Sequence, residues 1–143
     1  MTDKDPVVYG TATAPTFQRS ITTRLSYAEV LARLRKSIEA ADVWILAEVD
    51  AQMLLAKDGY RIGSARQILC FHPRYMARLL TADPAALLEA PLKFAVIELP
   101  DATIAVNWYD PTVAYARYQN AGLTALAADL SRLCQDIAEQ ALR

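Results

Sequence analysis

The sequence has 143 residues, of which 54% are hydrophobic and 22% are charged, so it holds enough apolar material for the core of one compact domain. Its formal net charge of -1 provides no global positive field, which disfavours nucleic acid as the main partner. No run approaches the roughly 20 apolar residues that span a bilayer, and the first residues lack the apolar segment of a signal peptide. We therefore expect a soluble, cytoplasmic protein without a membrane span.

The N-terminal part divides into an arm, a strand and a helix. Residues 1–16 are rich in Thr, Ala, Asp and Pro without a sustained period, and they predict a flexible arm or a strand added to a sheet edge. Residues 17–25 alternate between apolar and polar side chains, which predicts a half-buried strand. Ser26 precedes Glu29 by three positions in a capping-box arrangement, and apolar residues then recur at helical spacing, so a helix is expected over residues 27–41.

A second strand and a short helix follow. Residues 43–50 are apolar on both faces as far as Ala47, which predicts a strand in the interior of a sheet. Residues 52–57 are compatible with a short helix that Gly59 would end. Residues 60–65 are expected to form a loop.

The central part of the chain predicts a strand followed by two helices. Residues 66–71 form the expected strand, with Cys70 and, just beyond the strand, His72 on one of its faces. Proline suits the first helical turn because its missing N–H would have no partner there, so the proline after His72 is expected to open a helix over residues 73–82. The same logic predicts a shorter helix over residues 84–89.

The C-terminal part predicts a hairpin and two helices. Residues 92–99 and 103–109 are β-rich and are separated by a connection short enough for an antiparallel hairpin. Helical spacing follows over residues 113–118 and 123–142. This order of elements favours an α+β fold over a repeated βαβ unit, and it places residues 17–143 in a single domain.

Several runs of the sequence resemble a known family. Its most specific features here are three X-Pro steps within longer matching runs: His72-Pro73, Asp83-Pro84, and Ala90-Pro91 in the run Ala90-Pro91-Leu92-Lys93. With these, about residues 17–140 resemble the DUF302 family, whose function is uncharacterised. The resemblance implies a TBP-like fold, in which helices pack on a curved antiparallel sheet of about five strands, commonly as a homodimer. It implies neither an activity nor DNA binding.

The chain departs from the family's pattern at two places. Many members carry Asp-His at the end of the second strand, where this chain has Asp50-Ala51, so no role of that histidine is carried over. Members also commonly have Asn before the proline at the position of His72.

Cys70 and His72 form the first candidate site, because a thiolate and an imidazole suit a soft transition metal or haem. Zinc takes about four ligands, so Glu48, Asp50 or a second subunit would have to complete the site. The alternative is a buried thiol and a helix-capping imidazole. The other cysteine, Cys134, lies 64 positions away, a count and spacing that favour reduced thiols but leave a single disulfide open.

The second candidate site is a pocket for a small anionic or aromatic ligand. The helix N-terminus after His72 projects partial positive charge, and Arg66, Arg74 and Arg61 could surround it. The alternative for these arginines is surface ion pairs. Aromatic side chains could wall a cavity between sheet and helices, or pack in the core instead; they are Tyr75, Trp108, Tyr109, Tyr115 and Tyr118.

No catalytic residue is assigned, since the sequence contains no triad, paired-carboxylate or Gly-rich phosphate motif. Three function classes remain open. The first is a homodimeric domain that binds a small anionic or aromatic ligand through His72, Arg66, Arg74, Cys70, Tyr75 and Trp108. The second is a metal, haem or redox protein using Cys70 and His72, and the third is a structural or protein-interaction module. The sequence predicts no particular cofactor.

Overall fold

A five-stranded antiparallel sheet is the centre of the fold in the computed structural model, which describes residues 4–143. The strands stand in the order β2-β7-β6-β5-β3. Their bounds are β2 Gln18–Thr23, β3 Trp44–Asp50, β5 Ala65–Phe71, β6 Leu92–Glu98 and β7 Ile104–Tyr109. The predicted α+β fold with an antiparallel sheet of about five strands is therefore confirmed.

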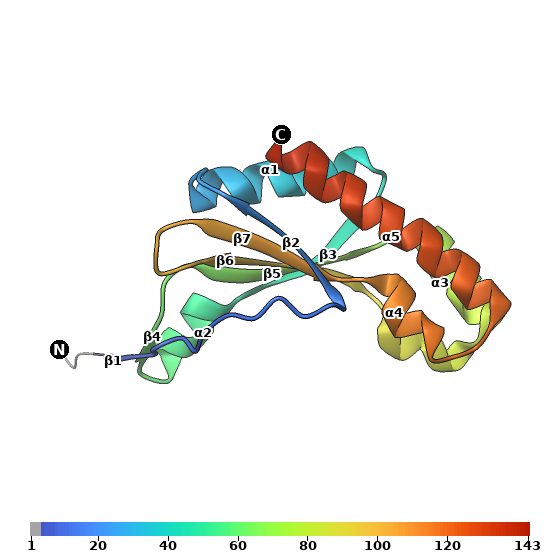
Figure 1. The fold of residues 1–143 in the computed structure, drawn as a ribbon, viewed down its shortest axis with the longest axis horizontal. Helices are drawn as coiled ribbons and strands as arrows, with labels where there is room; N and C mark the ends of the chain where they lie inside the picture. The colour runs from blue at the N-terminus through green and yellow to red at the C-terminus, as the bar shows by residue number, and fades with distance from the viewer. Residues whose placement is uncertain (1–3) are drawn as a thin grey trace.

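Helices cover one face of this sheet. The elements between and after the strands are α1 Tyr27–Ala40, α2 Ala51–Lys57, α3 Pro73–Ala82, the 3-10 helix η1 Pro84–Glu89, α4 Pro111–Ala116 and α5 Ala121–Leu142. Figure 1 shows α1 and α5 side by side above the sheet, with α3, η1 and α4 gathered at one end and α2 beneath the opposite end. No helix of the part that the structure describes is long and apolar enough to cross a membrane.

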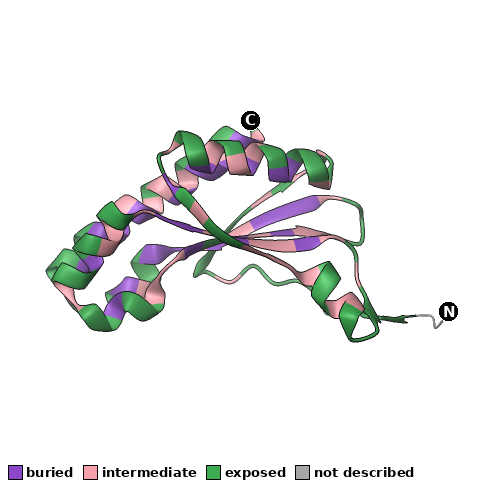
Figure 2. Cartoon of the chain, turned by 180° about the vertical axis from the view of Figure 1, so that it is seen from behind, coloured by how far each residue is buried: buried purple, intermediate pink, exposed green. Residues whose placement is uncertain are grey.

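The core lies between the sheet and the α1–α5 layer. Alternate residues of β6, namely Leu92, Phe94 and Val96, are buried on the helix side, because successive side chains of a strand point to opposite faces. Figure 2 shows the buried residues on the strands and on the inner sides of the helices. Over residues 4–143 no long helix lies on the opposite face of the sheet, and part of that face is reached by solvent, as the exposed Lys93 of β6 shows.

Capping explains most helix starts. His72 caps α3, and Asp110 and Asn120 cap α4 and α5 with their side-chain oxygens. Helix α4 therefore begins at Pro111, two residues before the predicted start, since Asp110 accepts the backbone N–H of Thr112 at 3.0 Å.

Two predicted features of the first half are wrong. Strand β3 is an edge strand, not an interior one, and its register with β5 shifts at a bulge between Ile45 and Ala47. Its apolar side chains Trp44 and Leu46 are about half exposed, so apolar character on both faces did not mean burial on both. Residues 60–65 are not wholly loop, because β4 (Tyr60–Arg61) pairs in parallel with β1 (Asp5–Pro6). This pairing ties part of the N-terminal segment to the domain.

Candidate functional site

His72 caps a helix, and within residues 4–143 its imidazole makes no other polar contact. Its Nδ1 accepts the backbone N–H of Arg74 at 3.0 Å, which satisfies one donor of the first turn of α3. Its ring lies with its edge toward Trp44, the centroids 5.2 Å apart. The capping role that the sequence left open is therefore the one that the geometry shows.

Cys70 faces the core and is fully buried beneath the helices. Burial raises the pKa of its thiol to about 12, and burial also raises the pKa of Cys134 on α5. Both are free thiols, so the structure contains no Cys70–Cys134 disulfide. Within residues 4–143 no three His, Cys, Asp or Glu side chains come together in a way that could hold a metal ion, so this part of the chain supplies no third ligand to Cys70 and His72.

Arg66 does not lie near His72. The two residues stand at opposite ends of β5, which at about 3.3 Å per residue separates them by roughly 20 Å. Arg66 instead pairs with Glu48 and Asp50 of β3, at 3.1 Å each. Glu48 also binds Arg35 of α1 at 2.7 Å, and the hydrogen bond from Arg35 is the main cause of the lowered pKa of Glu48.

Arg74 is close to His72 but is already satisfied. Its guanidinium donates to the backbone oxygens of Asp42 and Ala41, at 2.6 and 3.3 Å, and lies 4.4 Å from the centre of the Tyr75 ring. This contact ties the start of α3 to the end of α1. The grouping of Arg66, Arg74 and His72 around one anion pocket is therefore not found.

Most of the aromatic candidates pack in the core. Trp108 and Tyr115 are buried, the first against Phe94, and Tyr75 lies beside Phe71. Tyr109, at the end of β7, differs because it lines a groove that opens on the solvent-facing side of the sheet.

This groove, which we call the sheet groove, has a volume of about 630 Å³. Its floor is formed by β5, β6 and β7, and its walls by η1, α4 and the residue before β2. The large apolar side chains of the lining are Phe17, Leu69, Leu88 and Val113, and its polar side chains are Glu89, Lys93, Tyr109, Asp110 and Arg117. A concave, mostly apolar surface of this size with a few polar groups is typical of small-molecule sites.

Hydrogen bonds hold the groove's polar wall in place. The Tyr109 hydroxyl donates to the backbone oxygen of Glu89 at 2.7 Å, which joins the end of β7 to the end of η1. Arg117 of α4 pairs with the Glu89 carboxylate at 3.0 Å. Burial raises the pKa of Tyr109, so its hydroxyl stays protonated and remains a donor.

Asp110 anchors the start of α4 beneath this wall. It is the buried acidic residue of the core, pairs with Arg19 at 3.0 Å and accepts the Thr112 hydroxyl at 2.7 Å. Burial opposes its ionisation, but the hydrogen bonds from Thr112 and the charge of Arg19 outweigh it, so the pKa of Asp110 is lowered.

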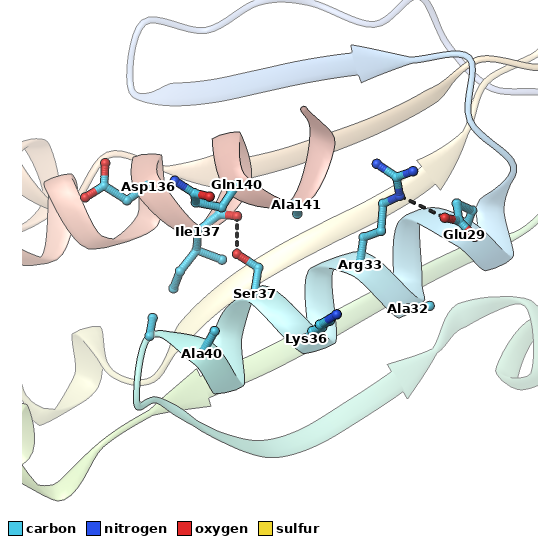
Figure 3. Close-up of a pocket in the computed structure, with 11 residues that line it drawn as sticks. Glu29, Ala32, Arg33, Lys36, Ser37, Ala40, Asp136, Ile137, Gln140 and Ala141 are labelled. Carbon is cyan, nitrogen blue, oxygen red and sulfur yellow. Dashed lines mark hydrogen bonds and ion pairs between the residues drawn. The ribbon is translucent and has the colours of Figure 1, made fainter.

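A second hollow lies between α1 and α5 and has a volume of about 760 Å³. Figure 3 shows Ser37 of α1 reaching the backbone of Ile137 in α5, a hydrogen bond of 2.6 Å, and Arg33 reaching Glu29 at 2.8 Å. Alanines line part of this hollow where the two helices meet, and two of its polar side chains, Ser37 and Arg33, are held by the hydrogen bonds just named. It is weaker than the sheet groove as a candidate because none of its lining residues is an exposed large apolar side chain, whereas Phe17, Leu88 and Val113 of the sheet groove are.

The family comparison covers most of the chain. The model of the domain of unknown function DUF302 matches residues 19–141. The chain belongs to the DUF302 family. A crystal structure of an uncharacterized conserved DUF302 protein from Bacillus stearothermophilus shares the fold, with a TM-score of 0.83 and 18% sequence identity over 90% of this chain and 100% of that one. No curated protein matches this DUF302 chain.

The sheet groove of this DUF302 domain was missed from the sequence because its lining comes from four separate segments. One signal was present. Lys93 is the only charged residue in the otherwise apolar run Leu92–Ile97, and the strand period places it on the face opposite Leu92 and Phe94. A lone charge on an otherwise apolar strand marks the solvent side of a sheet.

Proposed function

We propose that this DUF302 domain binds a small anionic or aromatic molecule, and that the sheet groove is its site. The observation that carries the proposal is the lining itself: apolar side chains from four segments face a polar wall of Glu89 and Arg117. The strands beneath fix the floor, so the site is preformed, which lowers the entropy cost of binding.

The exposed apolar side chains of the groove support this proposal. Val113 is 47% exposed, Phe17 49% and Leu88 87%, although the surrounding domain buries most of its large apolar residues. Such side chains around a concave surface gain free energy when a ligand removes them from water.

We also propose that the domain is a homodimer, as the family resemblance implies. Support comes from β3, an edge strand that exposes Trp44 and Leu46. An apolar sheet edge is open to pairing with another chain unless a partner covers it.

A second candidate function is a protein-interaction module. The nearly complete exposure of Leu88 at the end of η1, beside the half-exposed Leu87, favours it. A protein partner would bury these leucines together, whereas a small ligand would contact only the part of Leu88 that faces the groove.

The fluorescent dye 8-anilinonaphthalene-1-sulfonate, a small aromatic anion whose emission rises in apolar surroundings, tests the groove directly. We expect saturable fluorescence enhancement with the parent protein and weaker binding by the Val113→Gln variant. The matched control is Leu54→Gln on α2, which is exposed to a similar degree, 49%, but lies outside the groove. If both variants bind the dye as the parent does, the groove is not the site.

A further inference from the structure

We infer that the ligand of the sheet groove is an organic monoanion with an apolar tail, such as a medium-chain carboxylate, and that Lys93 holds its head group. This inference rests on the proposed function and deepens it. Lys93 belongs to the run Ala90-Pro91-Leu92-Lys93 that resembles the DUF302 family, and this resemblance gives it no binding role.

The charges around the groove cancel except at Lys93. Glu89 is paired with Arg117 at 3.0 Å, and its side chain is only 12% exposed. Asp110 is paired with Arg19 at 3.0 Å. The side chain of Lys93 makes no hydrogen bond or ion pair with any residue between 4 and 143, so the lining keeps one unpaired positive charge.

The position of Lys93 suits a head-group site. Lys93 lies on β6, directly opposite Leu69 of β5 in the antiparallel pairing. Its aliphatic side chain therefore starts from the floor of the groove between apolar neighbours and carries the ammonium group at its end. A ligand bound there can place its anionic end on Lys93 and its tail against Leu88 and Val113, which form the walls. The apolar walls and the single charge thus match the two ends of one amphipathic molecule.

Other ligand classes fit less well. An organic cation would be repelled by the positive charge of Lys93. It would also find no free carboxylate at Glu89, because Arg117 already neutralises that group. A multiply charged phosphate would need several donors, and the second cation of the lining, Arg117, is engaged. The Lys93 ammonium is a single point charge and lacks the forked donor geometry of a guanidinium. It therefore balances a ligand with one negative charge.

Isothermal titration calorimetry with octanoate and with 1-octanol separates the head group from the tail. We expect the parent protein to bind octanoate more tightly than 1-octanol by up to about fivefold, the scale of a partly exposed ion pair. Each methylene added to the carboxylate should tighten binding by up to about fourfold until the tail fills the groove.

Three variants complete the test. Lys93→Gln should remove the preference for octanoate over 1-octanol, and Lys93→Arg should retain it because the charge is kept. The control is Lys36→Gln, which removes an exposed lysine of the α1–α5 hollow and should leave octanoate binding unchanged. Far-ultraviolet circular dichroism establishes that each variant is folded.

The outcomes distinguish the inference from the proposal beneath it. If the parent binds both compounds equally, or if Lys93→Gln keeps the preference for octanoate, Lys93 does not hold a head group, and the inference is wrong while the groove still stands as a site. If Lys36→Gln abolishes octanoate binding, the anion binds at the α1–α5 hollow, which overturns the inference. Dye binding that is insensitive to Val113→Gln contradicts the proposed function itself.

Discussion

At the scale of single residues, His72 shows how one side chain serves the backbone. Its Nδ1 accepts a helix N–H, a role that asparagine performs as well or better. The departure of this chain from the family's usual asparagine is therefore compatible with an unchanged fold. Among the residues that the structure describes, the imidazole has no polar partner besides the Arg74 N–H.

The substitution His72→Asn tests this role. We expect the free energy of unfolding to stay within about 1 kcal/mol of the parent, because the cap is kept, whereas His72→Ala should lose about 0.5–2 kcal/mol. Urea denaturation measures both. An Asn variant as unstable as the Ala variant would show that the ring contact with Trp44, not the cap, stabilises this junction.

Asp110 predicts a pH dependence of stability. The pKa of Asp110 is lower in the folded protein than in the unfolded chain, where it is about 4. The ionised carboxylate therefore stabilises the fold fully above the unfolded pKa, and this stabilisation is lost as the pH falls through the folded pKa. The difference in unfolding free energy between the parent and Asp110→Asn should thus be largest at neutral pH and shrink in acid. Denaturation curves from pH 7 down to pH 3 measure this difference, and a constant gap would contradict the assignment.

At the scale of elements, local signals accounted for the helices and most strands. Proline after a capping residue predicted the start of α3 at Pro73, and two β-rich runs predicted β6 and β7 to within a residue. Nonlocal pairing was not predictable in the same way. Tyr60–Arg61 becomes a strand only because Asp5–Pro6, far away in sequence, lies beside it. The edge position of β3 likewise depends on which strands are its neighbours.

Helix α5 buries a stripe of apolar residues at helical spacing, and a substitution at its centre tests how much this stripe stabilises the fold. Leu130 is fully buried at the centre of this helix, so Leu130→Ala should destabilise the fold by about 2–5 kcal/mol. The control is Leu88→Ala, which changes a side chain that is 87% exposed and should alter stability by less than about 0.5 kcal/mol. A loss below 2 kcal/mol for Leu130→Ala would mean that the stripe does not form the core described here.

The candidate site was harder to predict than the elements. Arg66 and His72 are near in sequence and were predicted to line one pocket. The extended strand β5 between them keeps the two side chains far apart in space. Tyr109 was considered only as part of an aromatic cavity. Its neighbours in the sheet groove, Phe17, Lys93 and Val113, come together only after the hairpin, η1 and α4 have packed.

At the scale of the whole molecule, the two sheet edges differ in character. Strand β2 is polar along most of its length, whereas β3 exposes Trp44 and Leu46. The contrast favours β3 as the edge that a second copy covers.

Light scattering at micromolar concentration tests the proposed homodimer. We expect twice the chain mass of 15.8 kDa for the parent, and a shift toward that single-chain mass when Trp44 and Leu46 are both changed to Lys. Thr22→Lys on the polar edge serves as the control and should remain a dimer. A measured mass of 15.8 kDa for the parent protein would contradict the proposed homodimer.

We propose the sheet groove, and neither the His72 region nor the α1–α5 hollow, as the site that binds the ligand. Two-dimensional NMR of the labelled protein titrated with octanoate tests it most directly. We predict the largest amide shifts at Leu69, Lys93, Tyr109 and Val113, with little change elsewhere. Shifts centred on His72 and Arg74, or on Ser37 and Ile137, would contradict the claim.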